Sequence, residues 1–404
     1  MKNNLILFFT IILFISCRKP ADSVVEEPVE DLLSYNHWGT FNTGGKCRDL
    51  DISDSILVAA ANNNGFFVFS IDSTNQTLDT VYHGTDLDPT MGNDRAKRIL
   101  ISEEHNIIFI LEEGNKIYMH KLIGTQYTNN WVGSCELFEN SFLSTAIDDR
   151  EDRIGIFALV KHYSNSPDWD AYSTSLVWKN LIDIDPDNTQ TNSGFPQCEL
   201  TYNFSESSSE LYFSDSLLSV SNGELGVLIL KQTGKNICVD ENGEEFPEFI
   251  PTGDYEEDWE YCTNPSWQDG LGGEFEPAGG MLPEIFSFFD TPGSVNSLYS
   301  EGNYIFAALS TSNGCYMVEI NDVGDVIYTL PFAQGYTING VHESDGLIGL
   351  AAGHAGVLLY EWDGFMDIMY LGNLQTSYAN KIKVQGNRVF VATEDGIDIF
   401  EIER

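Results

Sequence analysis

A repeated pattern of apolar and polar positions runs through most of the chain. An apolar stretch is followed by a tight polar turn that contains Gly, and then by a second stretch with alternating apolar residues. The clearest copies are ILVAAANNNGFFVFSID (56–72), IIFILEEGNKIYMHKL (107–122), LLSVSNGELGVLILK (217–231), YIFAALSTSNGCYMVEI (304–320), LIGLAAGHAGVLLYEW (347–362) and RVFVATEDGIDIFEI (388–402). Each copy predicts two antiparallel strands joined by a hairpin turn.

A seventh copy with a longer loop between its strands, together with the strands that flank each copy, defines the fold class. Its two strands are expected at 154–163 and 173–183, with a longer loop between them. A shorter strand precedes each copy and another follows most of them, which makes four strands per unit. Seven such units predict an all-β fold, a seven-bladed β-propeller over residues 33–404. The strand residues expected in its core include Val58, Phe67, Phe69, Ile108, Phe306 and Val391.

The N-terminal segment has the sequence pattern of the strand that the last unit lacks. The last copy stops at Arg404 after three strands, one fewer than a full unit. His37-Trp38-Gly39-Thr40 has the pattern of the outer strand in other units, such as Tyr370-Leu371-Gly372-Asn373. We therefore expect residues 35–42 to pair beside 396–402, so that the N-terminal strand closes the last blade and leaves no open edge there.

The second strand of several copies carries a family resemblance. GFFVFSID (65–72), GVLLYEWD (356–363) and GIDIFEIE (396–403) each run from Gly through an apolar strand to an acidic residue. In this the chain resembles LVIVD-repeat proteins. The resemblance implies an exported β-propeller, of which many are lipoproteins of Bacteroidota-type cells, and it implies no particular activity.

The N-terminus has the features of an export signal. Lys2 precedes an apolar run at 5–15, and Ser16 and Cys17 follow it. The run is shorter than the roughly 20 residues of a membrane span. Residues 14–17 resemble a lipobox, which predicts a signal peptide at 1–17 and a lipid on Cys17; the alternative is an ordinary signal peptide cut nearby. Residues 18–32 are expected to be a flexible acidic tether, and the location an outer membrane, facing the periplasm or the cell exterior.

The net charge limits the partners. The chain has 62 acidic and 20 basic residues, a formal charge of −42. Such a surface repels phosphate backbones, so no nucleic-acid binding is expected. It also repels anionic headgroups, which leaves the lipid as the only membrane link. We expect a monomer whose partner is a protein or carbohydrate of the cell envelope.

Two of the cysteines lie in one irregular segment of the chain. Residues 232–283 interrupt the fourth unit between its third and fourth strands and predict an acidic loop insertion. Cys238 and Cys262 both lie in it and are the expected disulfide, because export permits disulfides and this segment needs one. The sequence does not choose a pairing for Cys47, Cys135, Cys198 and Cys315. No Cys or His spacing typical of zinc is present.

Candidate ligand-binding residues cluster on one face of the expected ring. The hairpin turns between strands two and three and the connections from strand four to the next unit share that face, around the channel mouth. The candidates are Asp94, Arg95, His162, Trp169, His354, Tyr378 and Asp395. Trp169 is either a binding platform or a plug against a neighbouring blade, and His354 is either a surface turn residue or a ligand or base.

Two acidic runs are candidates for cation binding. DIDPDNT (183–189) places Asp183, Asp185, Asp187 and Asn188 as a calcium loop does, but the run fills a turn position and departs from the EF-hand pattern. DYEEDWE (254–260) is either a solvated acidic loop or a site for a cation or sugar. No metal site or cofactor is expected, with calcium as the alternative.

The sequence thus predicts a lipid-anchored, non-catalytic binding or scaffolding propeller. The alternative is a hydrolase, lyase or lactonase-like propeller that uses acidic residues and His at the channel mouth. It requires at least two of Asp94, Arg95, His162, His354 and Asp395 to converge in space.

Overall fold

The computed structural model describes part of the chain. The described residues are 33–85, 95–102, 104–112, 117–121, 130–133, 141–150, 153–161, 174–180, 199–204, 208–232, 236–240, 245–247, 249–250, 255–266, 270–276, 281–365 and 367–403. The predicted signal peptide, Cys17 and the tether lie outside them, as do Cys135, Cys198 and the candidate calcium run at 183–189.

The described strands form seven four-stranded antiparallel sheets. Sheet 1 contains β2 (Asp49–Ser53), β3 (Ile56–Ala60), β4 (Phe66–Asp72) and β5 (Thr77–Gly84). Sheet 2 contains β6 (Ala96–Ser102), β7 (Ile107–Glu112), β8 (Ile117–Lys121) and β9 (Asn130–Gly133). Sheet 3 contains β10 (Ser141–Arg150), β11 (Arg153–Lys161), β12 (Thr174–Asn180) and β13 (Glu199–Phe204).

The other four sheets follow the same order with two exceptions. Sheet 4 contains β14 (Leu211–Ser214), β15 (Leu217–Ser221), β16 (Val227–Gln232) and β19 (Met281–Phe289). Sheet 5 contains β20 (Val295–Glu301), β21 (Tyr304–Leu309), β22 (Cys315–Ile320) and β23 (Val326–Phe332). Sheet 6 contains β24 (Gly340–Ser344), β25 (Leu347–Ala351), β26 (Val357–Trp362) and β27 (Ile368–Leu374). Sheet 7 contains β28 (Ala379–Gln385), β29 (Arg388–Thr393), β30 (Gly396–Glu403) and, from the other end of the chain, β1 (Ser34–Phe41).

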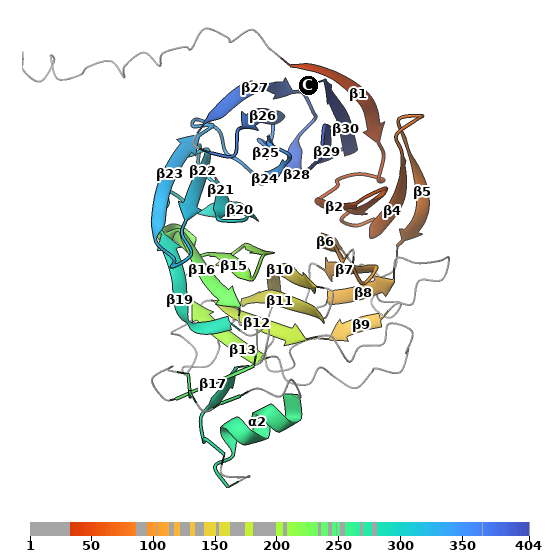
Figure 1. Ribbon diagram of the computed structural model, residues 1–404. Coiled ribbons are helices and arrows are strands. Elements are labelled where there is room, and N and C mark those ends of the chain that lie inside the picture. Colours follow the sequence, from red (N-terminus) through yellow and green to blue (C-terminus); the bar gives the residue numbers. More distant parts are fainter. Residues whose placement is uncertain are drawn as a thin grey trace, which may run out of the picture.

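The sheets are arranged around a ring, with the first strand of each nearest the centre (Figure 1). These inner strands contact one another in a closed cycle, in the order β2, β6, β10, β14, β20, β24, β28 and back to β2. The prediction of an all-β propeller is confirmed, with 64% of the described residues in strands and 3% in helices.

The count of whole blades differs from the number of four-stranded sheets. A count of whole blades gives six, whereas the strand pairing gives seven four-stranded sheets. Each of these sheets has its own strand register, and the inner strands of all seven meet in sequence around the ring.

The core lies between neighbouring sheets. Val58, Ile108, Phe306 and Val391 are fully buried, as the pattern predicts. The turns between strands require Gly where strands lie close together. Gly356, at φ +81°, is an example, because a Cβ there would lie 2.2 Å from the carbonyl oxygen of Leu374.

The predicted pairing of the two chain ends is confirmed. β1 runs antiparallel to β30, from Ser34 opposite Glu403 to Phe41 opposite Ile397. Trp38 and Phe41 pack on the apolar cluster that contains Ile397 and Ile399. The fourth strand of sheet 7 thus comes from the N-terminus, and it supplies both backbone hydrogen bonds and apolar contacts.

The strand directions define two faces. On the mouth face lie the turns between second and third strands, such as Glu394–Asp395, and the connections between sheets, such as 42–48. On the opposite face, the tether face, lie the first-to-second and third-to-fourth turns. Because Ser34 pairs with Glu403, β1 begins at the tether face.

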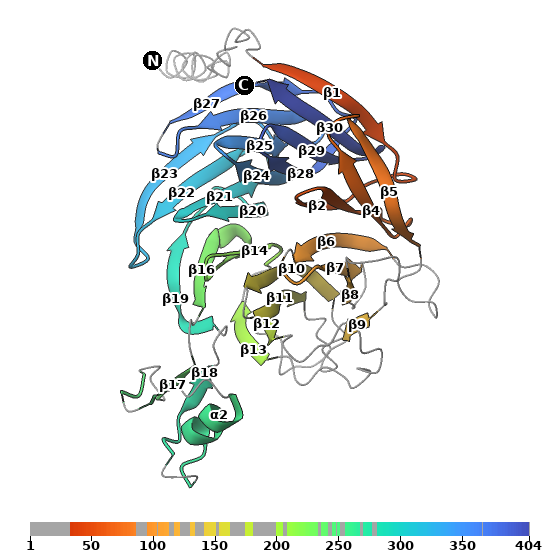
Figure 2. The same cartoon turned by 45° about the vertical axis from the view of Figure 1, so that its right-hand side comes forward.

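The insertion in sheet 4 is more structured than an acidic loop. Between β16 and β19 it holds a hairpin of β17 (Ile237–Val239) and β18 (Glu274–Glu276) and the helix α2 (Tyr255–Thr263). Figure 2 shows this small lobe projecting away from the ring. A disulfide joins Cys238 to Cys262, the pairing expected from the sequence, and Asn236 donates a hydrogen bond to buried Asp258 at 2.7 Å. These cross-links hold the helix on the hairpin, which explains why residues 255–260 are helical instead of the predicted loop.

A short 3-10 helix, η1 (Gly223–Leu225), forms the turn between β15 and β16. Among the described residues, no helix is long and apolar enough to span a bilayer.

Candidate functional site

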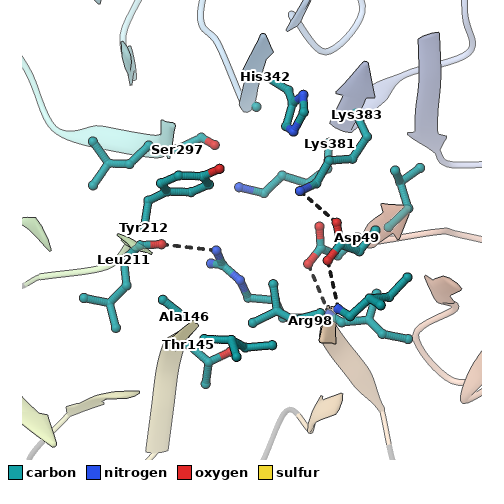
Figure 3. A pocket seen from close by; sticks show the side chains of 18 of the residues that line it. Asp49, Arg98, Thr145, Ala146, Leu211, Tyr212, Ser297, His342, Lys381 and Lys383 are labelled. Carbon is teal, nitrogen blue, oxygen red and sulfur yellow. Dashed lines mark hydrogen bonds and ion pairs between the residues drawn. The ribbon is translucent and has the colours of Figure 1, made fainter. Parts of the chain in front are cut away.

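A cavity of about 200 Å³ lies at the centre of the ring, lined by residues of all seven inner strands. Figure 3 shows charged side chains from several sheets pointing into it, among them Arg98, Lys381, Lys383 and Asp49. The inner strands therefore meet around a polar centre, in contrast to the apolar layers between the sheets.

Part of this polarity satisfies the inner edges of the sheets. An edge strand has a row of backbone N–H groups without partners in its own sheet, and such groups need acceptors when they are buried. The carboxylate of Asp49 accepts from the N–H of Ile99 at 3.2 Å. Asp51 accepts from Ile101 in the same way at 2.9 Å. These acidic residues are thus acceptors for the edge of the neighbouring sheet.

His342 has the same role between sheets 6 and 7. Its Nδ1 accepts from the N–H of Val384 at 3.2 Å, so the neutral ring carries its proton on Nε2. Burial lowers the pKa of His342 well below its ordinary value, and the charge of Lys383 lowers it further. This direction agrees with the neutral ring that the bond from Val384 requires.

An ion bridge crosses the channel. Glu210 extends from the start of sheet 4 and contacts Arg98 of sheet 2 at 2.5 Å and Lys381 of sheet 7 at 3.3 Å. Arg98 also donates to the hydroxyl of Ser144 in sheet 3. We call Glu210, Arg98 and Lys381 the cross-channel bridge. It joins sheets that are not neighbours in the ring.

The bridge contains one carboxylate and two cations, and the carboxyl group of Asp49 lies within their electrostatic influence. Burial raises the pKa of Glu210, but the charges of Arg98 and Lys381 outweigh burial and leave this pKa below its ordinary value. For Asp49 burial prevails and raises the pKa, although Arg98 and Lys381 oppose it. Lys383 pairs separately with Asp51 at 2.8 Å. Basic and acidic side chains from four sheets thus meet at the centre of the ring.

Polar side chains also join neighbouring sheets at the mouth-face end of the channel. In each case a residue at the start of an inner strand donates to a carbonyl at the start of the next. The pairs are Lys97 to Leu143 at 2.9 Å, Ser209 to Val295 at 3.2 Å, Asn296 to Ile338 at 3.0 Å, Asn339 to Ala379 at 3.0 Å and Asn380 to Cys47 at 2.9 Å. The last pair links sheet 7 to sheet 1 and so continues the series across the point where the chain closes.

A second group of side chains meets on the mouth face. The rings of His354 and Tyr378 lie edge to face, with centroids 4.7 Å apart. Lys46 lies 6.0 Å from the Tyr378 ring centre and pairs with Glu394 at 2.6 Å. Asn339 donates to the Tyr378 hydroxyl at 3.3 Å. We call Lys46, Asn339, His354, Tyr378 and Glu394 the mouth cluster.

Only some of the predicted site residues come together in the structure. Asp94, His162 and Trp169 lie outside the described residues. His354 and Tyr378 come together, as described above. Arg95 and Asp395 are exposed, and among the described residues no hydrogen bond or ion pair links His354 with Asp395. The convergence that an enzyme would require is therefore not seen between His354 and Asp395.

The central residues were missed in the sequence, although a signal for them exists. Arg-Asp-Leu-Asp (48–51) and Lys-Ile-Lys (381–383) alternate charged and apolar residues within β-prone segments. In an inner strand, alternate residues reach the channel while the others are buried between sheets. Charged residues at such positions are the expected mark of a polar channel.

The remaining candidates for chemistry are metal ligands and thiols. Among the described residues, no group of three or more His, Cys, Asp or Glu side chains is placed to hold a metal ion. Cys47 and Cys315 are buried free thiols, and burial raises the pKa of each.

Comparison with known proteins identifies the fold only. No family model matches the chain, and no curated protein matches it in sequence. Solved propellers are similar in structure. The WD40 repeats of RRP9 match with a TM-score of 0.59 at 10% identity over 91% of this chain and 97% of that one. U3-55K matches with a TM-score of 0.57 at 10% identity over 91% and 98%, and the computationally designed Ika8 protein with 0.50 at 10% over 90% and 98%. At this identity the likeness concerns architecture alone, so the chain is similar to WD40-type structures as a β-propeller.

Proposed function

We propose that this chain is a non-catalytic binding or scaffolding β-propeller with seven blades. In this proposal it is exported, carries a lipid on Cys17 and faces the periplasm or the cell exterior at an outer membrane. Its partner is a protein or a carbohydrate of the envelope, bound at the mouth face. The N-terminal signal and the LVIVD-like repeats support the location, and the cycle of seven inner strands supports the blade number.

The mouth cluster is the observation that carries the proposed binding. Its side chains come from four separate connections of the chain: 42–48, 333–339, 352–356 and 375–378, with Glu394 added from the turn of sheet 7. Rigid strands hold these short connections, and binding residues are commonly presented in this way. An aromatic ring flanked by a His and an ion pair offers stacking, hydrogen bonding and charge to a partner.

The fixed geometry of Tyr378 strengthens this argument. Its hydroxyl accepts a hydrogen bond from Asn339, and Gly353, at φ +59°, lies close to its ring. A Cβ at Gly353 would lie 3.2 Å from two ring carbons, so a side chain there would require the ring to shift by a few tenths of an ångström. A ring held in place loses little conformational freedom when a partner binds, and this favours affinity.

The test screens the purified full-length chain against envelope glycans and envelope proteins. For any ligand found, Tyr378→Ala is expected to weaken binding about tenfold, a loss of about 1.4 kcal/mol. Val81→Ser, at an exposed position of the outer strand β5, serves as the control and should leave affinity unchanged. A turnover activity that Tyr378→Ala abolishes would contradict a non-catalytic role. Release of a Cys17→Ser variant from the membrane fraction tests the anchor separately.

A further inference from the structure

A groove of about 620 Å³ opens on the tether face, between sheets 5 and 6. The lining residues that matter here are Tyr299, Glu301, Glu343, Asp345, Trp362 and Asp363. They come from the turns β20–β21, β24–β25 and β26–β27 and from the ends of the adjoining strands. The groove lies on the face opposite the mouth cluster, so it is a separate site.

The lining of the groove is acidic. Glu301, Asp345 and Asp363 are exposed, and each sits on a different turn. The described residues that line the groove include no Lys or Arg. Burial raises the pKa of the Tyr299 hydroxyl, and the neighbouring Tyr212, Glu301 and Glu343 raise it further. The groove thus combines a local excess of negative charge with two aromatic residues, Tyr299 and Trp362.

An exposed aromatic residue adjoins the groove. Phe365 follows directly on the lining residues Asp363 and Gly364, and 71% of its surface is exposed. The indole N–H of Trp362 donates to the Phe365 carbonyl at 2.7 Å, and the Phe365 N–H donates to Asp363 at 2.9 Å. These two bonds fix the turn. The exposed ring is therefore presented by a defined backbone, which is typical of an anchor that a partner buries.

We propose that this groove, with Phe365 at its edge, binds a protein segment that presents Arg or Lys beside an apolar side chain. The cationic group enters the groove among Glu301, Asp345 and Asp363, and the apolar side chain covers Phe365. Charge complementarity favours this occupant over an anionic surface or ligand. Tyr299 and Trp362 are buried in the core beneath the groove, so they form its floor, and the exposed carboxylates and Phe365 are the groups that a partner meets.

The position of the groove defines where the partner would lie. β1 begins on the same face, so a partner docked here lies on the side of the ring where β1 begins. The mouth cluster remains accessible on the opposite side. The propeller would then hold two partners at once, which is the geometry of a scaffold.

The test uses two labelled peptides and the full-length chain. One peptide has an Arg-Leu-Arg core in Gly-Ser flanks, and the other has Glu-Leu-Glu in the same flanks. Fluorescence anisotropy should show binding of the first only. The double variant Asp345→Asn with Asp363→Asn, which keeps the side-chain shape and removes two charges, should weaken it about tenfold. Phe365→Ser should also weaken it about tenfold.

Matched controls separate this site from the general negative charge of the protein. Asp322→Asn and Val323→Ser change an exposed acid and an exposed apolar residue on the neighbouring β22–β23 turn, away from the groove. Both should bind the peptide as the unaltered protein does. Failure of the Arg peptide to bind, or equal losses in Asp322→Asn and in the double variant, would overturn the proposal.

A lipid surface is the other occupant that the test examines. Vesicles of phosphatidylcholine, sedimented with the Cys17→Ser chain, report contact of Phe365 with lipid. Vesicle binding that Phe365→Ser abolishes, together with no peptide binding, would assign the site to a membrane and overturn docking of a protein segment. Loss of the mouth-face ligand in Tyr378→Ala leaves the peptide result unaffected, so the two sites fail independently.

Discussion

Two features join distant parts of this chain, and they are held by different kinds of interaction. The seam of sheet 7 pairs β1 with β30 through backbone hydrogen bonds and covers an apolar cluster. The cross-channel bridge joins Glu210 to Arg98 and Lys381 through ion pairs at the centre of the ring. Both connect residues far apart in sequence, but only the seam removes an open sheet edge.

The seam should be the larger contribution to stability. Without β1, strand β30 would be an unpaired edge, and the cluster around Ile397 and Ile399 would lose Trp38 and Phe41. Backbone hydrogen bonds contribute about 1 kcal/mol each, and apolar burial adds to them along the whole strand. The favourable terms at the seam therefore accumulate without a compensating desolvation of charge.

In the cross-channel bridge, the cost of desolvation opposes the attraction between the charges. Removing charged groups from water costs several kcal/mol per ion, and the attraction between the ions roughly offsets this cost. The bridge therefore contributes little net stability while all three members are present. Losing one member leaves the others buried without compensation, which costs about 3–5 kcal/mol. A bridge of this kind favours one arrangement of the sheets more than it stabilises the fold.

The largest effect is expected from removing the seam strand. Deleting residues 33–43 should lower the free energy of unfolding by on the order of 5 kcal/mol or more, from lost strand pairing and lost apolar contacts. Thermal unfolding of this variant is compared with that of a chain lacking only 18–32. Equal melting temperatures for the two deletions would contradict the role of β1.

A smaller effect is expected at the channel centre. Glu210→Gln should cost about 3 kcal/mol near neutral pH, because Arg98 and Lys381 lose their shared carboxylate. Replacing Glu210, Arg98 and Lys381 together by Met should cost clearly less than the single change. If the triple variant is the less stable of the two in urea unfolding, the bridge contributes net stability and the distinction drawn above fails.

The effect of Glu210→Gln should also depend on pH. The pKa of Glu210 in the folded chain is below its unfolded value, so its stabilising contribution is full above the unfolded pKa and is lost as pH falls through the folded pKa. The stability difference between the unaltered chain and Glu210→Gln should therefore shrink on acidification below about pH 4. A difference that stays constant down to about pH 2 would mean that Glu210 is not held ionised by its partners.

The seam was predictable because its signal is local. The outer-strand pattern at 37–40 matches that of other units, and the last unit lacks one strand. The Gly-containing turns indicated the hairpins in the same way. Burial of Val58, Ile108 and Phe306 follows from the unbroken apolar runs of the second strands, whose residues are buried on both faces of the sheet.

The channel centre was less predictable because its members come from three sheets. The alternation around Lys381 indicates a polar channel but not a partner, and the contact of Lys381 and Arg98 with Glu210 arises only when the ring closes. The helix at 255–263 was missed for a related reason: the disulfide and the Asn236–Asp258 bond that hold it act across the insertion. The mouth cluster was predicted in part, since His354 and Tyr378 were expected and Lys46 and Glu394 were not among the selected candidates.

The seam also fixes the face at which β1 begins, which is the face of the acidic groove and lies opposite the mouth cluster. A cross-link tests it most directly. Ser34 lies opposite Glu403, and facing residues of antiparallel strands are close enough for a disulfide.

The variant Ser34→Cys with Glu403→Cys should form this disulfide on mild oxidation, identified by mass after proteolysis. Ser34→Cys with Ser344→Cys, which lies at the end of β24 in the next sheet, should remain reduced. A disulfide between the two introduced thiols of the first variant, and none in the second, is the expected result. If the first variant stays reduced, or if both variants cross-link equally, the two ends of the chain do not share one sheet.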